Sequence, residues 1–283
     1  MRIGGPAALW VSVDVLSDDY NNLLQVIALC RSHDVPFFTM GSGSNILAPD
    51  AGYDGVIIAL ARGVAAPRIT DNAVQVDAGS LLGDLVRTTA QLGWSDLEFL
   101  VGIPGTVGGA LAMNAGTAKR WIGEVVKTVT VLDLSRTDQV EPQYLSADEI
   151  TWGYRSSSLR DAALILAAEL FLKERQDPLT IQKDLQERLE LRKKSQPLSL
   201  PNAGSVFRNP DGDSAGRLIE AVGLKGKTIG GAQFSELHAN FIVNRGNASS
   251  EDVMALIKDA QQRVFEEYGV RLQKEIRLLG TET

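Results

Sequence analysis

The residues best suited to chemistry lie in a glycine-rich segment from Glu98 to Gly116. It holds five glycines and one proline among Leu, Val, Ile and Phe, and it is almost uncharged. Flexible linkers are polar, so this apolar segment is expected to be buried. Backbone without side chains lets a flat or extended ligand lie against the peptide groups, where N–H donors can bond it. We interpret the segment as a cofactor-binding surface, because a tight turn between core elements explains only Ile103-Pro104-Gly105.

A second glycine-rich turn, Gly41-Ser-Gly-Ser-Asn45, follows an expected strand. Consecutive N–H groups and short polar side chains in such a turn suit a diphosphate. The spacing is neither the G-x-G-x-x-G of a Rossmann fold nor a P-loop, which ends in G-K-[ST]. Alone, the motif is as consistent with a plain turn as with binding. Together with segment 98–116, it predicts that one end of a dinucleotide lies on each.

Three polar side chains elsewhere are candidates with open alternatives. Ser205 has no G-x-S-x-G or S-x-x-K context, and with only two histidines in the chain a triad base is missing. It is therefore either a turn serine or a proton donor. Arg155 stands between an aromatic residue and three serines, and alone it can serve a surface ion pair. Glu275 is either a solvated strand carboxylate or a functional one.

The elements that position these residues follow from hydrophobic periodicity. Strands are expected at 9–15, 35–40 and 56–60, with a helix over 18–33, so that the first glycine turn follows the end of a strand, where ligands usually bind. A second unit begins near Ile69. It has strands at 74–78, 125–133 and 163–173 and a helix at 81–92. The strand at 163–173 is apolar enough to be buried on both faces.

The C-terminal part begins with a charged amphipathic helix over 178–196, and a domain boundary is expected just before it. A loop at 202–210, a short helix at 215–222 and a strand at 239–244 follow. The sequence Ser249-Ser-Glu-Asp is a good N-cap pattern for the next helix. A last strand at 270–279 is expected to place Val270, Leu272, Ile276 and Leu278 on one face and Glu275 on the other.

Composition narrows the function classes. The chain has 283 residues, of which 44% are hydrophobic and 22% charged, as in ordinary globular proteins with room for two domains. A net charge of −7 argues against nucleic-acid binding, so an anionic ligand must be held by local positive groups. The single cysteine excludes intrachain disulfides, and two histidines make a metal site improbable. Without a membrane-length apolar run or signal peptide, we expect a cytoplasmic protein with no membrane or obligate protein partner.

Several motifs together, in order over nearly the whole chain, resemble one family: the flavoprotein UDP-N-acetylenolpyruvoylglucosamine reductases of cell-wall synthesis. The matching stretches are Arg2-Ile-Gly-Gly-Pro-Ala, 41–47, 102–110, 114–116, 153–157, 202–210, 230–233, 238–244 and Glu275. The chain is similar to the shorter branch, which lacks the extra elements and tyrosine loop of the longer one. Family members usually carry a lead-in segment before Ile-Gly-Gly-Pro. Its lack here implies either a start placed late or a flavin pocket without a short capping segment.

The resemblance implies an α+β fold. A two-subdomain FAD-binding fold of the vanillyl-alcohol-oxidase/PCMH-like type is expected over 1–174, with subdomains at about 1–66 and 67–174, and a smaller α/β substrate-binding domain over 175–283. It also implies that NADPH reduces FAD, which then reduces the enolpyruvyl ether of UDP-N-acetylglucosamine to UDP-N-acetylmuramate. This step belongs to peptidoglycan precursor synthesis, and so to cell shape and division. Two alternatives remain open: another FAD-dependent oxidoreductase on the same scaffold, or a non-catalytic sugar-nucleotide-binding relative.

The resemblance also implies roles for particular residues. Ser205 matches the position that protonates C2 of the substrate, Arg155 grips its carboxylate, and Glu275 is the acidic partner at that carboxylate. Tyr154 and Asn209 are expected substrate contacts. On charge alone, Arg217 is a candidate for the UDP diphosphate, as are Arg208, Lys225 and Lys227. The expected cofactor-binding residues are Gly41, Ser42, Gly43, Ser44, Asn45, Gly102, Ile103, Pro104, Gly105, Thr106, Gly108, Gly109, Asn114, Ala115 and Gly116.

Overall fold

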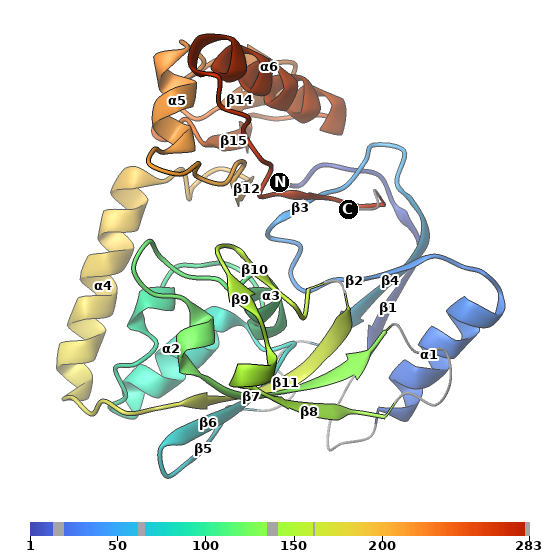
Figure 1. Cartoon of the computed structure of the whole chain (residues 1–283), viewed down its shortest axis with the longest axis vertical. Helices are drawn as coiled ribbons and strands as arrows, with labels where there is room; N and C mark the ends of the chain where they lie inside the picture. The colour runs from blue at the N-terminus through green and yellow to red at the C-terminus, as the bar shows by residue number, and fades with distance from the viewer. Residues whose placement is uncertain (14–19, 62–65, 135–140, 161, 281–283) are drawn as a thin grey trace. The chain divides into compact units, whose positions relative to one another are not determined.

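The computed structural model describes residues 1–13, 20–61, 66–134, 141–160 and 162–280. The chain forms two compact units (Figure 1). Unit 1 contains Met1–Leu9, Gly43–Gly55 and Leu191–Thr283, and unit 2 contains Trp10–Ser42 and Val56–Glu190. The chain therefore crosses from one unit to the other four times. The functional boundary between residues 174 and 175 stays a prediction.

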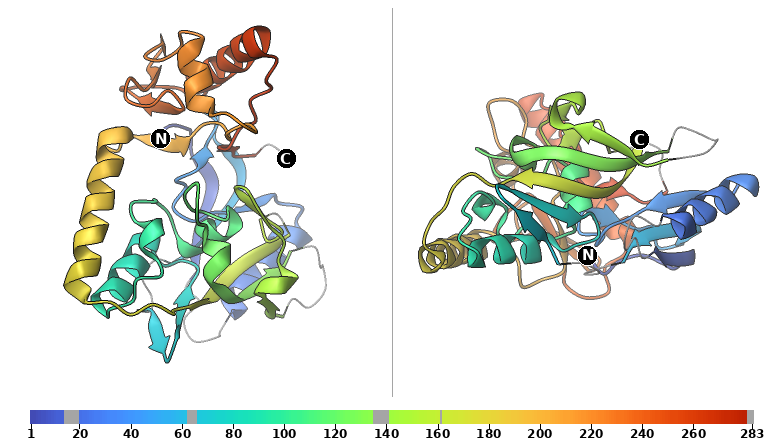
Figure 2. Two further views of the ribbon diagram at one scale, coloured as in Figure 1. Left: turned by 60° about the vertical axis from the view of Figure 1, so that its left-hand side comes forward. Right: turned by 90° about the horizontal axis from the view of Figure 1, so that it is seen from below.

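Unit 2 is built on a five-stranded antiparallel sheet, which Figure 2 shows from two further sides. Its order is β5 (Arg68–Thr70), β6 (Ala73–Asp77), β11 (Ala163–Phe171), β7 (Val126–Asp133) and β8 (Gln143–Ser146). The central strand β11 has apolar side chains on both faces. Ile165 and Leu170 belong to one core cluster, whereas Leu164 and Leu166 belong to another. This confirms the expected burial of the strand on both sides.

Two clusters of apolar side chains pack against that sheet. One cluster packs β6, β7 and β11 against α2 (Leu82–Gln91), the short helix η2 (Glu98–Leu100) and α3 (Val107–Ala112). The other packs β11 against α1 (Asn21–Ser32) and a three-stranded sheet. That sheet has the order β1 (Ala7–Val13), β4 (Tyr53–Leu60) and β2 (Phe37–Thr39), and β2 runs parallel to β4. The predicted strand 9–15 and helix 18–33 each extend into residues 14–19, outside the described residues.

Unit 1 contains a four-stranded antiparallel sheet that packs with α5 (Ala215–Ala221) and α6 (Ser250–Tyr268) around one core cluster. Its order is β12 (Asn202–Ser205), β15 (Phe241–Asn244), β14 (Ala232–Phe234) and β13 (Thr228–Ile229). The prediction of a loop over 202–210 is wrong at its start, because β12 pairs with β15. Gly204, with φ of +77°, sits in the irregularity between the paired residues Asn202 and Ser205, and this break hides the strand pattern.

The predicted strand 270–279 is wrong in extent, because only Arg277–Leu278 (β16) is a strand, paired in parallel with β3 (Ile46–Leu47). Upstream of it, Lys274 forms a bridge with Phe207 instead. The segment thus changes its pairing partner near Ile276. The predicted apolar face, Val270, Leu272, Ile276 and Leu278, does pack on one core cluster. Leu279 on the opposite parity is buried as well, however, and one continuous ladder does not form.

The remaining regular elements of the described residues are short. They are the hairpin of β9 (Trp152–Gly153) and β10 (Ser156–Ser157) and the 3-10 helices η3 (Ile122–Val125) and η4 (Ala147–Glu149). The long helix of the C-terminal part, α4, covers Pro178–Ser195. Within the described ranges, no helix combines the length and apolar character of a bilayer-spanning segment.

Candidate active site

The two glycine-rich segments meet within unit 2. A Cβ atom at Gly41 would lie 2.3 Å from Oγ1 of Thr106, so a side chain at position 41 would clash. Thr106 is the N-cap of α3, and its Oγ1 accepts a hydrogen bond from the N–H of Gly109 at 3.3 Å. The two segments are therefore in close contact here, and glycine at position 41 is what allows it. That one end of a dinucleotide lies on each segment stays a prediction.

The prediction of a buried segment with available N–H donors is partly wrong at the start of α3. The N–H of Val107 donates to the carbonyl of Ser80, and that of Gly108 donates to the carbonyl of Ala78, both at 2.9 Å. A Cβ at Gly108 would lie 2.9 Å from the Cβ of Ala78. Gly108 thus allows α3 to pack closely against the segment that follows β6. The N–H groups of Val107 and Gly108 bond carbonyls of that segment and are not available to a ligand.

The part of this segment that faces outward is its backbone at Pro104 and Gly109, both exposed. Gly105 has φ of +126°, and Gly102 has φ of +71°; both values favour glycine. A Cβ at Gly109 would meet only Thr106 Oγ1, at 3.5 Å, so the surface there is open. An extended ligand can lie against this bare backbone.

The residues around this surface fit a dinucleotide. The hydroxyl of Ser42 is enclosed, and it has no hydrogen-bond partner among the residues that the structure describes. A serine hydroxyl turns toward a phosphate by rotation about a single bond, and phosphate oxygens are strong acceptors. The hydroxyl of Ser42, next to Gly41, is therefore the polar group here that fits a ligand phosphate, because the N–H of Gly109 is bonded to Thr106.

Asn114 is an expected cofactor ligand, but its side-chain amide forms hydrogen bonds within the protein. It is 3% exposed, with φ of +43°. Its Oδ1 accepts from the N–H of Gly123 at 3.0 Å, and its Nδ2 donates to the carbonyl of Gly153 at 2.9 Å. Close packing accounts for Gly116, where a Cβ would lie 2.2 Å from the carbonyl oxygen of Arg120. Asn114 therefore fastens the β9–β10 hairpin to the end of α3.

That hairpin carries Tyr154 and Arg155 as its two turn residues, because Gly153 pairs with Ser156. Arg155 has φ of +54°, a left-handed conformation that costs a non-glycine residue on the order of 1 kcal/mol. Its guanidinium carbon lies 5.2 Å from the centre of the Tyr154 ring. Ser157 Oγ anchors the hairpin by donating to the carbonyl of Ala112 in α3 at 3.1 Å. Arg155 and the glycine-rich surface therefore share one unit.

Unit 1 brings Ser205 and Glu275 together. Ser205 ends β12, and the N–H of Glu275 donates to the carbonyl of the next residue, Val206, at 2.8 Å. Asn45, from the glycine–serine turn, donates through Nδ2 to the carbonyl of Glu275 at 3.0 Å. The carbonyl of Asn45 in turn accepts from the N–H of Arg277 at 3.0 Å. The backbone of Glu275 is thus fixed on one side to the serine strand and on the other to the turn.

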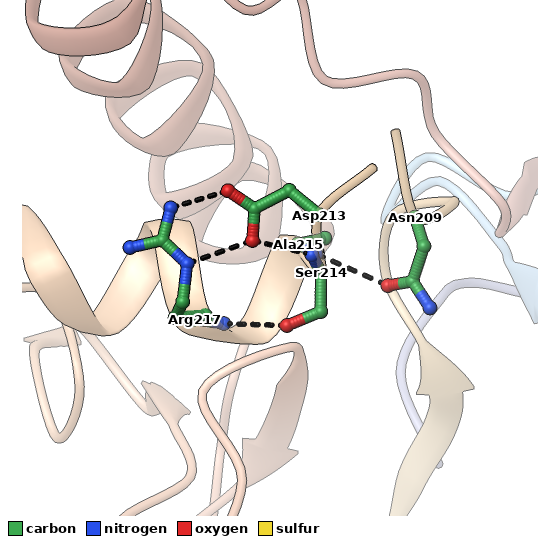
Figure 3. A network of polar contacts seen from close by, with 5 residues as sticks. All are labelled: Asn209, Asp213, Ser214, Ala215 and Arg217. Atoms are coloured by element: carbon green, nitrogen blue, oxygen red, sulfur yellow. Dashed lines mark hydrogen bonds and ion pairs between the residues drawn. The ribbon is translucent and has the colours of Figure 1, made fainter. Parts of the chain in front are cut away.

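Asn209 and Arg217 lie at the start of α5, as Figure 3 shows. Asn209 Oδ1 accepts from the N–H of Ala215 at 3.1 Å, and Ser214 Oγ accepts from the N–H of Arg217 at 3.2 Å. Arg217 Nε donates to Asp213 at 2.7 Å, and this bond lowers the pKa of Asp213 to about 2. The Arg217 side chain is still 55% exposed, so an anion can reach it.

The other basic candidates have acidic neighbours. Lys225 pairs with Glu220 at 2.9 Å, and Lys227 pairs with Asp259 at 2.7 Å. Arg208 is anchored through its backbone N–H, which donates to the carbonyl of Gln273 at 2.9 Å. The geometry thus distributes positive charge along this part of unit 1 and balances it with local carboxylates.

Sequence reasoning missed Asn240, which is 3% exposed and lies next to the serine strand. Its amide bonds both backbone groups of Phe207, at 3.0 Å to the N–H and 2.8 Å to the carbonyl. The available signal is the polar residue within the otherwise apolar stretch Ala239–Val243. A buried asparagine requires partners, and the chain provides them here.

Two family models match separate parts of the chain. Residues 12–140 match the FAD binding domain family, and residues 196–279 match the family described as UDP-N-acetylenolpyruvoylglucosamine reductase, C-terminal domain. The UDP-N-acetylenolpyruvoylglucosamine reductases of Synechococcus sp. (strain JA-3-3Ab) and Trichlorobacter lovleyi are each 41% identical to this chain. Both alignments cover 99% of it, and 88% and 89% of the respective relatives.

A solved structure points the same way. The crystal structure of UDP-N-acetylenolpyruvylglucosamine reductase from Thermus caldophilus superimposes with a TM-score of 0.74 at 38% sequence identity, covering 88% of each chain. The expected FAD-binding fold with a second domain and the expected class of FAD-dependent oxidoreductase are confirmed. With 41% identity over 99% of its length, the chain belongs to the family of UDP-N-acetylenolpyruvoylglucosamine reductases.

Proposed function

We propose that this chain reduces the enolpyruvyl ether of UDP-N-acetylglucosamine to UDP-N-acetylmuramate, with NADPH as the source of hydride. The observation that supports it most directly is the 2.8 Å hydrogen bond from the N–H of Glu275 to the carbonyl of Val206, beside Ser205. This bond holds the backbone of Glu275 beside the strand that carries Ser205. A hydroxyl and a carboxyl group carried on neighbouring backbone suit the addition of a proton to a substrate that carries a carboxylate. The names of the relatives agree with this reaction.

When held in this chain, FAD would supply the chemistry of hydride transfer between NADPH and C3 of the enolpyruvyl group. We assign its binding to the glycine segments 41–45 and 102–116. Tyr154 and Arg155 stand on the hairpin that Asn114 and Ser157 fasten to α3, in the same unit. A guanidinium stays charged and can grip a carboxylate with two parallel bonds. We therefore assign Arg155 to the substrate carboxylate.

Addition of hydride at C3 places negative charge on C2 and the carboxylate of the substrate. Preorganised donors at that carboxylate are then the main source of rate acceleration. Ser205 donates its proton to C2, which completes the reduction. A hydroxyl is a weak acid, but the carbanion-like intermediate is strongly basic, so the transfer is favourable. We assign Glu275 to the substrate carboxylate, as the acidic residue whose backbone lies beside the strand of Ser205.

Asn209, Tyr154 and Arg217 are proposed to contact the sugar nucleotide. Asn209 Oδ1 accepts from the N–H of Ala215 at the start of α5, so we assign only the amide N–H groups of Asn209 to the ligand. Arg217 combines partial exposure with a fixed position against Asp213, which suits a diphosphate. We place the reaction in the cytoplasm, since NADPH and sugar nucleotides are made there.

The test is anaerobic spectroscopy of the purified protein. It should be yellow, lose its flavin absorbance when NADPH is added, and regain it on addition of the enolpyruvyl sugar nucleotide, with UDP-N-acetylmuramate as product. Flavin that is reoxidised by O₂ but not by the sugar nucleotide would favour another oxidoreductase on the same scaffold. Protein that binds the sugar nucleotide without turnover would favour a non-catalytic relative.

A further inference from the structure

We propose that Asn240 is a positioning residue that sets the placement of Ser205 relative to Glu275. This inference rests on the proposed reductase function, in which both residues act in the half-reaction that consumes the enolpyruvyl substrate. Asn240 touches neither reacting group. It acts through the backbone of the segment 206–208.

The contacts of Asn240 reach two consecutive residues of that segment. Its Oδ1 accepts from the N–H of Phe207 at 3.0 Å, and its Nδ2 donates to the carbonyl of Phe207 at 2.8 Å. Its own backbone carbonyl accepts from the N–H of Val206 at 2.8 Å. Val206 and Phe207 are both 0% exposed, so these bonds have no competition from water.

The opposite side of the same segment carries Glu275. The carbonyl of Val206 accepts from the N–H of Glu275 at 2.8 Å, and the N–H of Arg208 donates to Gln273 at 2.9 Å. Phe207 and Lys274 form a β-bridge. Residues 206–208 therefore lie between Asn240 on one side and the Glu275 strand segment on the other, directly after Ser205.

An asparagine is specifically suited to this place. Strand β15 begins at Phe241, one residue after Asn240. The side-chain amide of Asn240 therefore extends the pairing by one residue beyond the start of the regular strand. The amide offers one acceptor and one donor group in a plane, as a peptide unit does. An aspartate of the same shape keeps the acceptor but points a second oxygen at the Phe207 carbonyl. A leucine leaves both backbone groups of Phe207 unpaired.

Contacts of His238 with Asn240 and Phe241 support the same geometry. The N–H of Asn240 donates to Nδ1 of His238 at 3.2 Å, and the His238 ring packs edge-on against Phe241, with centroids 4.9 Å apart. The start of β15 is thereby fixed before Asn240 reaches across to Phe207. A displacement of about 1 Å at a reacting group can reduce a rate by about 10²-fold, so loosening this frame should appear in the step that uses Ser205.

The experiment compares Asn240→Asp and Asn240→Leu with Asn244→Leu in the FAD-loaded protein. Asn244 is a matched control at the far end of β15, where its Oδ1 accepts from the N–H groups of Gly246 at 2.8 Å and Ala248 at 3.2 Å. Stopped-flow absorbance measures flavin reduction by NADPH and, separately, flavin reoxidation by the enolpyruvyl sugar nucleotide. Parallel runs in D₂O report whether proton transfer limits the second step.

We expect both Asn240 variants to reduce flavin within about twofold of the wild-type rate and to reoxidise it about 10²-fold more slowly. The D₂O effect on reoxidation should increase, because a misplaced Ser205 makes proton transfer slower. Asn244→Leu should lower the melting temperature without slowing reoxidation more than it slows reduction. If Asn240→Leu fails to fold, the isosteric Asn240→Asp carries the test.

Two results would overturn the positioning role. One is that Asn240→Asp slows both half-reactions by the same factor relative to wild type, or slows neither. The other is that Asn244→Leu also slows reoxidation much more than reduction. A separate result bears on the function itself. If the wild-type protein is reduced by NADPH and is never reoxidised by the enolpyruvyl sugar nucleotide, the proposed function fails, and the role of Asn240 fails with it. The wild-type trace therefore distinguishes the two failures.

Discussion

At the scale of single residues, the proposed chemistry depends on a weak acid acting on a strong base. A serine hydroxyl releases its proton reluctantly in water. The proposal requires the charge generated by hydride addition to be held at the substrate carboxylate, so that C2 is basic only where Ser205 can reach it. The backbone bond between Glu275 and Val206, at 2.8 Å, fixes the backbone of the acidic partner beside the strand that carries that hydroxyl.

Ser205→Ala should separate the two halves of the catalytic cycle. Flavin reduction by NADPH is expected to stay within about twofold of wild type, because no proton from Ser205 is needed there. Reoxidation by the enolpyruvyl sugar nucleotide should fall by about 10²–10⁴-fold, the usual contribution of a general acid. Stopped-flow flavin absorbance measures both rates. The control is Ser146→Ala, which removes the hydroxyl that caps η4; equal slowing of both halves in Ser205→Ala would refute the proton-donor role.

The sequence singled out Ser205 and Glu275 as candidates, but it could not show which residues hold them in place. Their motifs are local patterns, and the resemblance to a known family supplied their roles. Asn240 bonds Phe207 across 33 residues of chain, and Asn45 bonds Glu275 across 230. Such pairings arise only when distant strands are brought side by side, so hydrophobic periodicity carries no sign of them.

At the scale of elements, the β9–β10 hairpin presents Arg155 from a strained turn. Its φ of +54° is a conformation that glycine adopts without cost. An arginine retained in that conformation suggests that function outweighs local stability at this position. The side chain gains a fixed direction from the turn, which is anchored to α3 through Ser157.

Arg155→Gly should therefore lose activity without losing stability. We expect reoxidation by the enolpyruvyl sugar nucleotide to fall by at least about 10²-fold, the typical loss for one preorganised charge donor. The melting temperature should stay unchanged or rise, since the strain is relieved. Asp71→Gly is the matched control, because Asp71 has φ of +47° in the β5–β6 turn. A melting temperature that falls with the activity would mean that Arg155 serves the fold instead.

The N-terminus of α6 shows how unit 1 ties distant segments together. The Asp50 carboxylate accepts from the N–H of Ser250 at 2.8 Å and from its Oγ at 2.7 Å, across 200 residues of chain. Ser249 Oγ accepts from the N–H of Asp252 at 3.0 Å, and Asp252 returns a bond to the N–H of Ser249 at 3.0 Å. The orphan donors of the first helical turn are thus satisfied, partly by a residue from the segment that follows the glycine–serine turn.

Asp50→Ala should destabilise unit 1 by about 1 kcal/mol, the usual effect of a lost cap, limited by the exposure of this carboxylate. Hydrogen bonds from Ser250 lower the pKa of Asp50. The folded state therefore binds a proton less readily than the unfolded state, where the pKa is about 3.9. Its contribution is present above that pH and is lost as the pH falls below it.

Thermal unfolding followed by circular dichroism between pH 3 and pH 7 tests this. The gap between wild type and Asp50→Ala should be constant above about pH 5 and should narrow toward pH 3. Asp54→Ala, which removes an exposed carboxylate on β4, should leave the melting temperature nearly unchanged. A gap that is independent of pH would mean that the Asp50 charge contributes nothing to the cap.

The prediction of helices and strands was correct where a segment keeps one pairing partner along its length. It was wrong where a segment changes its pairing partner. The apolar run of β11 and the N-cap of α6 were readable because each is local. The stretch 270–279 packs its predicted apolar face on one core cluster, but its backbone pairs first near Phe207 and then with β3. A period of two reports which face is buried, and it does not report which strand lies alongside.

At the scale of the whole molecule, the chain leaves each unit and comes back to it, twice for unit 1 and once for unit 2. Gly43–Gly55 belongs to unit 1, although the neighbouring segments on both sides belong to unit 2. The glycine–serine turn therefore has Gly41 and Ser42 in one unit and Gly43–Asn45 in the other. Boundaries drawn along the sequence treat the chain as consecutive blocks, and such a short return has no compositional signal.

This division predicts which segments each ligand should protect from amide hydrogen exchange. FAD added to the cofactor-depleted protein should slow exchange in residues 41–45 and 102–109, because an ordered ligand covers that backbone. The enolpyruvyl sugar nucleotide, added afterwards without NADPH, should slow exchange in 154–157, 205–217 and 274–277, where the proposed substrate contacts lie. Peptides covering β8 and η4, residues 143–149, serve as the internal control and should not change. Protection by FAD that is confined to 196–279 and spares 102–109 would contradict the assignment of the cofactor to the glycine segments. Protection by the sugar nucleotide that spares 205–217 and 274–277 would contradict the assignment of Ser205 and Glu275 to the substrate.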